Sequence, residues 1–199
     1  MLIFIELVIL DVLFIGIIEG GIHMFTMEEI RVANLTSRAN GASAKNKDGS
    51  IRAIVPKYVA EHISKEESIL DFGAGKNAVH TQWLRKNGFN VTAYDFGDNL
   101  IDGLHDKNAL NKKYAVIMAS NVLNVQSSLC MLHETLNQIY SSLEPGGELI
   151  CNYPASPRKM MISTKEVADI IHSVFGTYVE KIGGTSSAPL WKVKKMYIS

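Results

Sequence analysis

The stretch that most constrains the fold of this chain is residues 69–77, which read ILDFGAGKN. A short apolar run contains an acid, Asp71, near its end, and two glycines follow in alternate positions before a helical pattern begins. Further along, a second apolar run at residues 91–94 ends in another acid, Asp95. Strand, glycine turn, helix, strand and acid, in that order, form the unit with which α/β proteins bind an adenosine-bearing cofactor. The sequence therefore predicts an adenosine pocket at this unit.

The rest of the chain alternates between strand-like and helix-like hydrophobic patterns. Strands are expected at residues 68–72, 89–94, 114–120, 148–153, 178–182 and 190–197. Helices are expected at residues 51–63, 78–87 and 129–143, and from Thr164 onward. Pro56 either lies in the first turn of its helix or breaks that helix. Residues 96–113 are poorly periodic, so any helix and strand there must be compressed. This alternation predicts a doubly wound, mostly parallel sheet with helices on both faces.

Two segments precede the domain expected at residues 51–199. Residues 24–50 are polar and contain Asn-Gly and Asp-Gly turn signals, which predict a loop-rich lead-in. Residues 1–23 form an apolar extension whose first 22 residues are interrupted by Glu6, Asp11 and Glu19. On the insertion scale the apolar residues gain roughly 6 kcal/mol and Asp11 costs about 3 kcal/mol, so insertion into a membrane is marginal.

Two interpretations of this extension stay open. It is either a marginal membrane helix or an upstream extension of a protein that starts at Met24 or Met27. No basic residue precedes the apolar run, as a signal peptide would require. Basic residues follow it, and the positive-inside rule then keeps the remainder in the cytosol. We expect a cytoplasmic protein, either free or tethered to a membrane through residues 1–22.

Composition narrows the class of partner and site. A chain of 199 residues suits one domain with a proper core. Its formal net charge of +0 gives no general attraction to nucleic acid, which remains a possible partner that the charge does not indicate.

Cys130 and Cys151 each fall in an apolar stretch, so we expect buried free thiols in a reducing compartment. No second pair of ligands accompanies Cys130 and His133, and no metal site is expected.

The order of motifs resembles the class I S-adenosylmethionine-dependent methyltransferases. Four elements match in sequence order: ILDFGAGKN, VTAYD, YAVIMASNVLNV and LEPGGELICNY. The closing strand–loop–strand is similar to the antiparallel hairpin that ends this family's sheet. The resemblance runs from about residue 51 to the C-terminus. It implies a Rossmann-like, seven-stranded type of sheet, S-adenosylmethionine as the cofactor, and methyl transfer as the activity.

By this resemblance, seven residues form the cofactor site: Asp71, Gly73, Ala74, Gly75, Asp95, Phe96 and Asn121. The two glycines let the backbone approach the cofactor where a side chain would collide. Asp71 would hold the methionine amino group, and Asp95 would accept hydrogen bonds from the ribose hydroxyls. The resemblance suggests that Phe96 packs on the adenine and places Asn121 beside the reacting end of the cofactor.

Departures from related motifs exclude two other ligands. Where many relatives continue with a third glycine, this chain has Asn77, preceded by Lys76, which argues against a dinucleotide and its pyrophosphate. A phosphate-binding P-loop would need glycine at Leu70 and serine or threonine at Asn77.

The catalytic residue is not identified by these patterns. Asn121 and Asn124 are weak candidates, because asparagines after a strand also cap the next helix. Asn152-Tyr153-Pro154 resembles the Asn-Pro-Pro-Tyr type of motif of amino-methylating DNA enzymes. It follows the fifth strand rather than the fourth and lacks the double proline, so we expect the exit turn of a strand there.

These motifs favour a methyltransferase whose acceptor is either a small molecule or an accessible macromolecular group. One alternative is a non-catalytic S-adenosylmethionine-binding subunit that partners a nucleic-acid-modifying enzyme. A nicotinamide-dependent enzyme is a third hypothesis. Labelled cofactor incubated with small molecules, proteins, RNA and DNA separates the first two, and calorimetry with both cofactors tests the third.

We predict that Asp95→Ala weakens cofactor binding by roughly 1–3 kcal/mol, because hydrogen bonds from the ribose hydroxyls to a charged group are lost. Titration calorimetry measures the effect. An unchanged affinity would remove Asp95 from the site.

Overall fold

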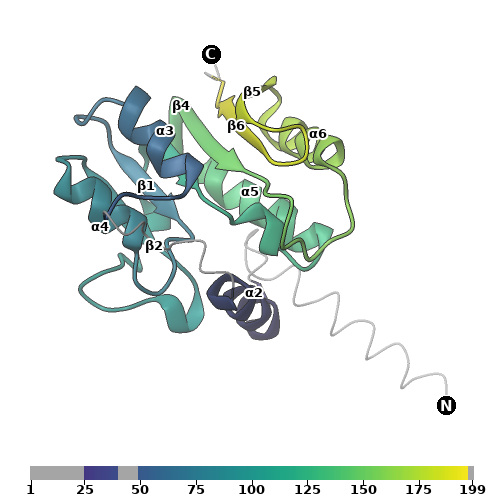
Figure 1. Cartoon of the computed structure of the whole chain (residues 1–199), viewed down its shortest axis with the longest axis horizontal. Helices are drawn as coiled ribbons and strands as arrows, with labels where there is room; N and C mark the ends of the chain where they lie inside the picture. The colour runs from purple at the N-terminus through teal and green to yellow at the C-terminus, as the bar shows by residue number, and fades with distance from the viewer. Residues whose placement is uncertain (1–24, 40–48, 197–199) are drawn as a thin grey trace, which may run out of the picture.

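Six strands form one sheet in a computed structural model that describes residues 25–39 and 49–196 (Figure 1). The strands are β1 (Ile69–Phe72), β2 (Val91–Tyr94), β3 (Tyr114–Ala119), β4 (Leu143–Asn152), β5 (Val179–Gly184) and β6 (Pro189–Lys194). Their order is β2-β1-β3-β4-β6-β5. The first four pair in parallel, and β6 pairs antiparallel with both β4 and β5. The predicted fold class is confirmed, including the closing antiparallel hairpin.

Helices cover both faces of this sheet, as Figure 1 shows. They are α3 (Ile54–His62), α4 (Val79–Lys86), α5 (Leu129–Ser142) and α6 (Thr164–Phe175). A fifth helix, α2 (Met27–Ala39), lies beyond the ends of the strands. Successive strand residues point to opposite faces, so Ile69 packs with α3 and α4 while Leu70 packs with α5 and α6. Pro56 lies in the first turn of α3, where its missing N–H costs no helical hydrogen bond.

The sheet has six strands because residues 96–113 form no strand. They contain two 3₁₀ turns, η1 (Gly97–Asn99) and η2 (Ala109–Asn111). The outer edge of β2 is closed in another way. Arg85 Nε donates to the Val91 carbonyl at 2.7 Å, and the Asp106 amide donates to the Ala93 carbonyl at 2.9 Å. These bonds satisfy edge carbonyls that could otherwise pair with another chain.

Helix α2 is where the structure departs most from the sequence prediction of a loop-rich lead-in. Thr26 and Glu29 form a reciprocal cap, in which each side chain accepts a hydrogen bond from the other residue's amide at 3.2 and 3.0 Å. Ala33 is the one buried apolar residue of α2 among those whose side chains are described. A helix with so few buried positions has a weak periodic pattern, and for this reason the sequence did not reveal it.

Three smaller findings complete the comparison. Strand β4 begins at Leu143, so it includes the Pro-Gly-Gly segment predicted to precede it. Cys151 is buried as expected, but the prediction for Cys130 was wrong: it is exposed, on the side of α5 away from the sheet. The apolar extension of residues 1–23 lies outside the described residues. None of the described helices combines the length and hydrophobicity that a membrane crossing requires.

We predict that Arg85→Ala lowers the free energy of unfolding by about 0.5–1.5 kcal/mol more than Lys86→Ala does. Both residues are exposed and lie in the last turn of α4, so helix propensity and the helix dipole affect them equally. Only Arg85 donates to the edge of β2. Urea unfolding measures the difference, and equal losses would show that the edge bond contributes nothing.

Candidate functional site

The turn after β1 is held in place by backbone hydrogen bonds that it donates to β2. Gly73 and Ala74 both donate their amides to the Tyr94 carbonyl at 2.9 Å. Gly73 has φ +73°, and a Cβ there would lie 2.7 Å from Cγ2 of Val122. Gly75 has φ +72°, and a Cβ there would meet nothing within 4 Å. Both positions favour glycine, and Gly75 faces open space that a ligand can approach.

Asp95 links this turn to the end of β2. Its Oδ2 accepts from the Gly75 amide at 2.5 Å, and its Oδ1 accepts from the Phe96 amide at 2.7 Å and from Asn99 Nδ2 at 3.2 Å. Burial raises the pKa of Asp95, and these three donors oppose that rise. A carboxylate has about four acceptor positions, so one remains for a ligand hydroxyl. Because Asp95 also holds the turn, the fold of any variant here needs checking without cofactor.

Asp71 lies deeper, inside β1. Its side chain is only 1% exposed, and Oδ2 accepts a hydrogen bond from Thr81 Oγ1 at 2.7 Å. Burial raises the pKa of Asp71 to about 7; the Thr81 bond opposes this rise, and the charge of Asp95 adds to it. Asp71 is therefore partly protonated near neutral pH.

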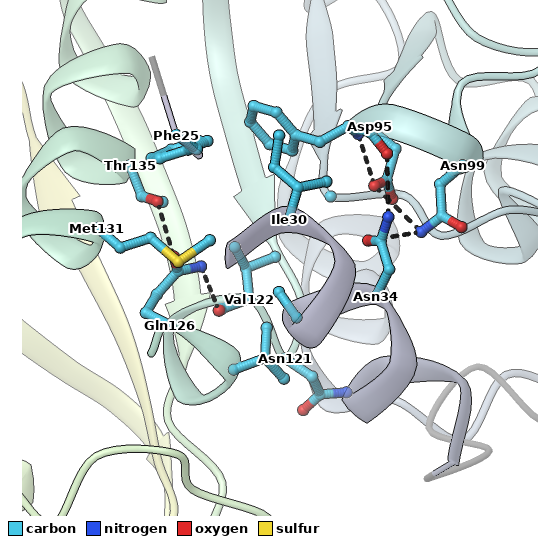
Figure 2. A pocket seen from close by; sticks show the side chains of 14 residues that line it. Phe25, Ile30, Asn34, Asp95, Asn99, Asn121, Val122, Gln126, Met131 and Thr135 are labelled. Atoms are coloured by element: carbon cyan, nitrogen blue, oxygen red, sulfur yellow. Dashed lines mark hydrogen bonds between the residues drawn. The ribbon is translucent and has the colours of Figure 1, made fainter. Parts of the chain in front are cut away.

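A cavity of about 50 Å³ lies beside these groups, beneath α2 (Figure 2). Its walls come from three places. The strand ends contribute Gly73, Asp95, Phe96, Asn99, Asn121 and Val122; the segment around α2 contributes Phe25, Ile30, Ala33 and Asn34; η3 (Leu123–Val125), the residue after it and α5 contribute Val125, Gln126, Met131 and Thr135. Four predicted site residues thus meet at one cavity: Gly73, Asp95, Phe96 and Asn121. The other three, Asp71, Ala74 and Gly75, do not line it.

Asn121 is tied to Asn152, the last residue of β4, which the sequence placed in a strand without a role in the site. Its amide donates to Asn152 Oδ1 at 2.7 Å, and Asn152 Nδ2 donates to Asn121 Oδ1 at 2.8 Å. Asn121 has φ +59°, a left-handed conformation that asparagine tolerates better than most residues. The pair holds the Asn121 side chain at the ends of β3 and β4. The Asn-Tyr-Pro sequence after β4 was the available signal for Asn152.

Asn124, the other weak catalytic candidate, points elsewhere. It is 2% exposed, and its Nδ2 donates to the Pro157 carbonyl at 2.8 Å. The amide of Lys159 in turn donates to the Asn124 carbonyl at 3.0 Å. Asn124 therefore anchors the connection between β4 and α6 and does not line the cavity.

Sequence reasoning missed the wall opposite Asp95. Gln126 donates from Nε2 to the Val122 carbonyl at 2.9 Å and accepts from Thr135 Oγ1 at 3.1 Å, and both side chains are buried. Ala33, Val125 and Met131 form an apolar cluster on which Phe25 packs. Among the described residues of the lining, Asp95 is the one ionisable group. Single apolar and amide residues on three elements leave no local motif, so only the tertiary structure could reveal this wall.

The residue types fit the adenosine part of S-adenosylmethionine. A glycine turn offers an open approach, a buried carboxylate retains an acceptor position, and the Phe96 ring lies at the same end. The volume beneath α2 does not fit the whole cofactor, because ligand pockets usually measure about 300–1,000 Å³.

Comparison with known proteins agrees with this geometry. The sequence model of a family described as "methyltransferase domain" matches residues 43–178. A search among curated proteins finds no match.

Several solved structures share the fold. A TehB-like SAM-dependent methyltransferase from Corynebacterium glutamicum has a TM-score of 0.61 at 15% identity, covering 83% of this chain and 98% of its own. A SAM-dependent methyltransferase from Bacteroides fragilis, in complex with S-adenosyl-L-homocysteine, has a TM-score of 0.54 at 15% identity, covering 74% and 79%. The 1,6-didemethyltoxoflavin-N1-methyltransferase from Burkholderia thailandensis has a TM-score of 0.54 at 12% identity, covering 90% and 93%. At these identities the likeness shows the fold alone.

We predict that Asp71 makes the protein without cofactor less stable as pH rises. Its pKa is higher in the folded state than in the unfolded state, so the stabilisation is complete below the unfolded value and is lost as pH rises through about 7. Relative to Asp71→Asn, which does not titrate, the wild type should lose roughly 2–4 kcal/mol of unfolding free energy between pH 4 and pH 8.

Urea unfolding at several pH values measures this difference. Asp102→Asn serves as the control, because it makes the same substitution at an exposed position. Parallel pH curves for the wild type and Asp71→Asn would contradict the prediction.

Proposed function

This chain belongs to the methyltransferase-domain family, and from that premise we propose that it methylates a small acceptor that carries no negative charge. The chain is a methyltransferase enzyme with a Rossmann-like fold, and its cofactor is S-adenosylmethionine. The proposal adds the class of acceptor and the roles of the residues around it. The observation that carries it is the neutral, largely apolar lining opposite Asp95.

This lining favours some acceptors over others. Phe25, Val125 and Met131 offer an apolar wall, while Gln126 and Thr135 offer a buried amide and a hydroxyl. A nucleic acid would be expected to meet lysine or arginine near its phosphates. Neither occurs in the described part of the lining. A neutral molecule with one polar atom for Gln126 or Thr135 suits this chemistry.

The fold itself accommodates an acceptor of this kind. The structure from Burkholderia thailandensis holds 1,6-didemethyltoxoflavin together with S-adenosylhomocysteine. That supports a small acceptor here as a proposal, and it does not identify the molecule.

In the mechanism that we propose, the protein aligns the acceptor with the methyl group of the cofactor. S-adenosylmethionine supplies an electrophilic methyl carbon on a positively charged sulfonium. Asp95 would hold a ribose hydroxyl with its remaining acceptor position, and the turn of Gly73 and Gly75 would let the backbone lie against the cofactor. Asn121, restrained by Asn152, would face the space where acceptor and cofactor meet. Holding two reactants in line replaces a bimolecular encounter and can supply much of the rate acceleration.

The lining also limits the acceptor atom. In its described part it contains no histidine, lysine or cysteine that could act as a general base. A base is needed only where the nucleophile carries a proton of high pKa. We therefore propose an acceptor atom with an available lone pair at neutral pH, such as an amine or heteroaromatic nitrogen. The alternative of a non-catalytic subunit has no support from the fold or the family.

The proposal predicts where a label will go. Purified protein is incubated with S-adenosylmethionine that carries a radioactive methyl group, together with small-molecule, protein, RNA and DNA fractions of a cell extract. We expect the label in the small-molecule fraction. Label that appears only in protein or nucleic acid would contradict the proposed acceptor class.

Two variants control this assay. Asp95→Ala should lose transfer in proportion to its lost affinity for the cofactor, whereas Asp102→Asn, which changes an exposed acid, should retain it. Loss of transfer in both would point to a general effect of charge.

A further inference from the structure

Two spaces of very different size lie on either side of α2. The cavity beside Asp95 measures about 50 Å³. An open groove of about 580 Å³ runs along the other side, between α2 and Gly97 and Asp98. The cavity alone is too small for a nucleoside-bearing cofactor, since ligand pockets usually measure about 300–1,000 Å³. The two spaces together are large enough.

Ile30 and Asn34 are the described residues that line both spaces, so they form the barrier between them (Figure 2). They lie four residues apart and therefore share one face of α2. The Ile30 side chain rests against η1: a Cβ added to Gly97 would lie 2.9 Å from Ile30 Cγ2. This contact closes the apolar half of the barrier.

Asn34 closes the polar half. Its Nδ2 donates to the Phe96 carbonyl at 3.1 Å, and its Oδ1 accepts from Asn99 Nδ2 at 2.9 Å. The same Asn99 nitrogen lies 3.2 Å from Asp95 Oδ1. Asn34 thus joins the hydrogen-bond network of the carboxylate that would bind the ribose. A cofactor bound at Asp95 and the Asn34 side chain would therefore compete for the same part of the wall.

Among the α2 residues whose side chains are described, Ala33 is the one buried apolar residue. Ala33 packs on Val125 and Met131, and Ser128 Oγ donates to Glu29 Oε1 at 3.2 Å. Met27 and Leu35 are 70% and 51% exposed. A helix with little buried apolar surface opens at low free-energy cost. The helix precedes the stretch of residues 43–178 that matches the family model.

We propose that Ile30 and Asn34 form a gate that excludes the cofactor when α2 is closed. Opening the gate joins the cavity to the groove and frees Asp95 and Asn99 for the adenosine. This inference rests on the proposed function. The protein then binds cofactor only in the open fraction, and the apparent dissociation constant equals the intrinsic one divided by that fraction.

Loosening the gate should therefore tighten binding. Asn34→Ala removes two hydrogen bonds from the closed state, and we expect the apparent dissociation constant for S-adenosylhomocysteine to fall about fivefold or more. Ile30→Ala, which removes the contact with Gly97, should act in the same direction. Titration calorimetry measures the affinity. Stopped-flow fluorescence measures the rate of association, which we expect to be faster.

Val32→Ala is the matched control, because Val32 lies on α2 and lines neither space. It should bind as the wild type does. Circular dichroism establishes that all variants are folded.

The outcomes separate the gate from the function. Weaker or unchanged binding by both Asn34→Ala and Ile30→Ala, in proteins that still bind the cofactor, would overturn the gate alone and show that α2 either clamps the cofactor or plays no part. A wild type and gate variants that all fail to bind would overturn the gate and the proposed function together.

Discussion

The hydrogen bond from the Gly75 amide to the Asp95 carboxylate is the contact on which the site depends. Parallel pairing places Phe72 opposite Tyr94, so the turn after β1 and the acid after β2 emerge at one edge of the sheet. The Gly73 and Ala74 amides hold the same turn by donating to the Tyr94 carbonyl. Only a left-handed backbone at Gly73 and Gly75 allows this path, which explains why both positions are glycine.

Two buried acids near this turn carry an energetic cost that the fold offsets in different ways. Asp95 receives three hydrogen-bond donors from three residues, while Asp71 receives its hydrogen bonds from Thr81, through the hydroxyl and the backbone. Burial raises the pKa of each carboxyl, and the charge of Asp95 raises that of Asp71 further. An apolar residue in either place would avoid this cost. A role in binding a cation or hydroxyl groups is a physical reason for keeping these buried carboxylates despite their cost in stability.

The molecule combines a shared core with local changes at its edges. The missing strand next to β2 is replaced by Arg85 and the loop around Asp106, which satisfy the carbonyls of the edge. Helix α2 lies over the carboxyl ends of the strands and contributes part of the cavity wall. The core holds the residues predicted to bind the cofactor, and α2 limits the space beside them. The same helix and the wall of Gln126 and Thr135 distinguish this site from a bare adenosine pocket.

The sequence by itself determined the core of this protein. Hydrophobic periodicity and the glycine turn act over neighbouring residues. The strands, the mostly parallel sheet with its closing hairpin, the class of cofactor and the position of Asp95 at the end of a strand could therefore be predicted. The sequence did not reveal α2, the partner of Asn121, or the wall of Gln126 and Thr135, and it wrongly predicted that Cys130 is buried. These features arise where single side chains from distant segments meet, and no local pattern records such a meeting. Tertiary packing alone decided that Ile30 and Asn34 stand beside Asp95, because only the folded chain brings them to one wall.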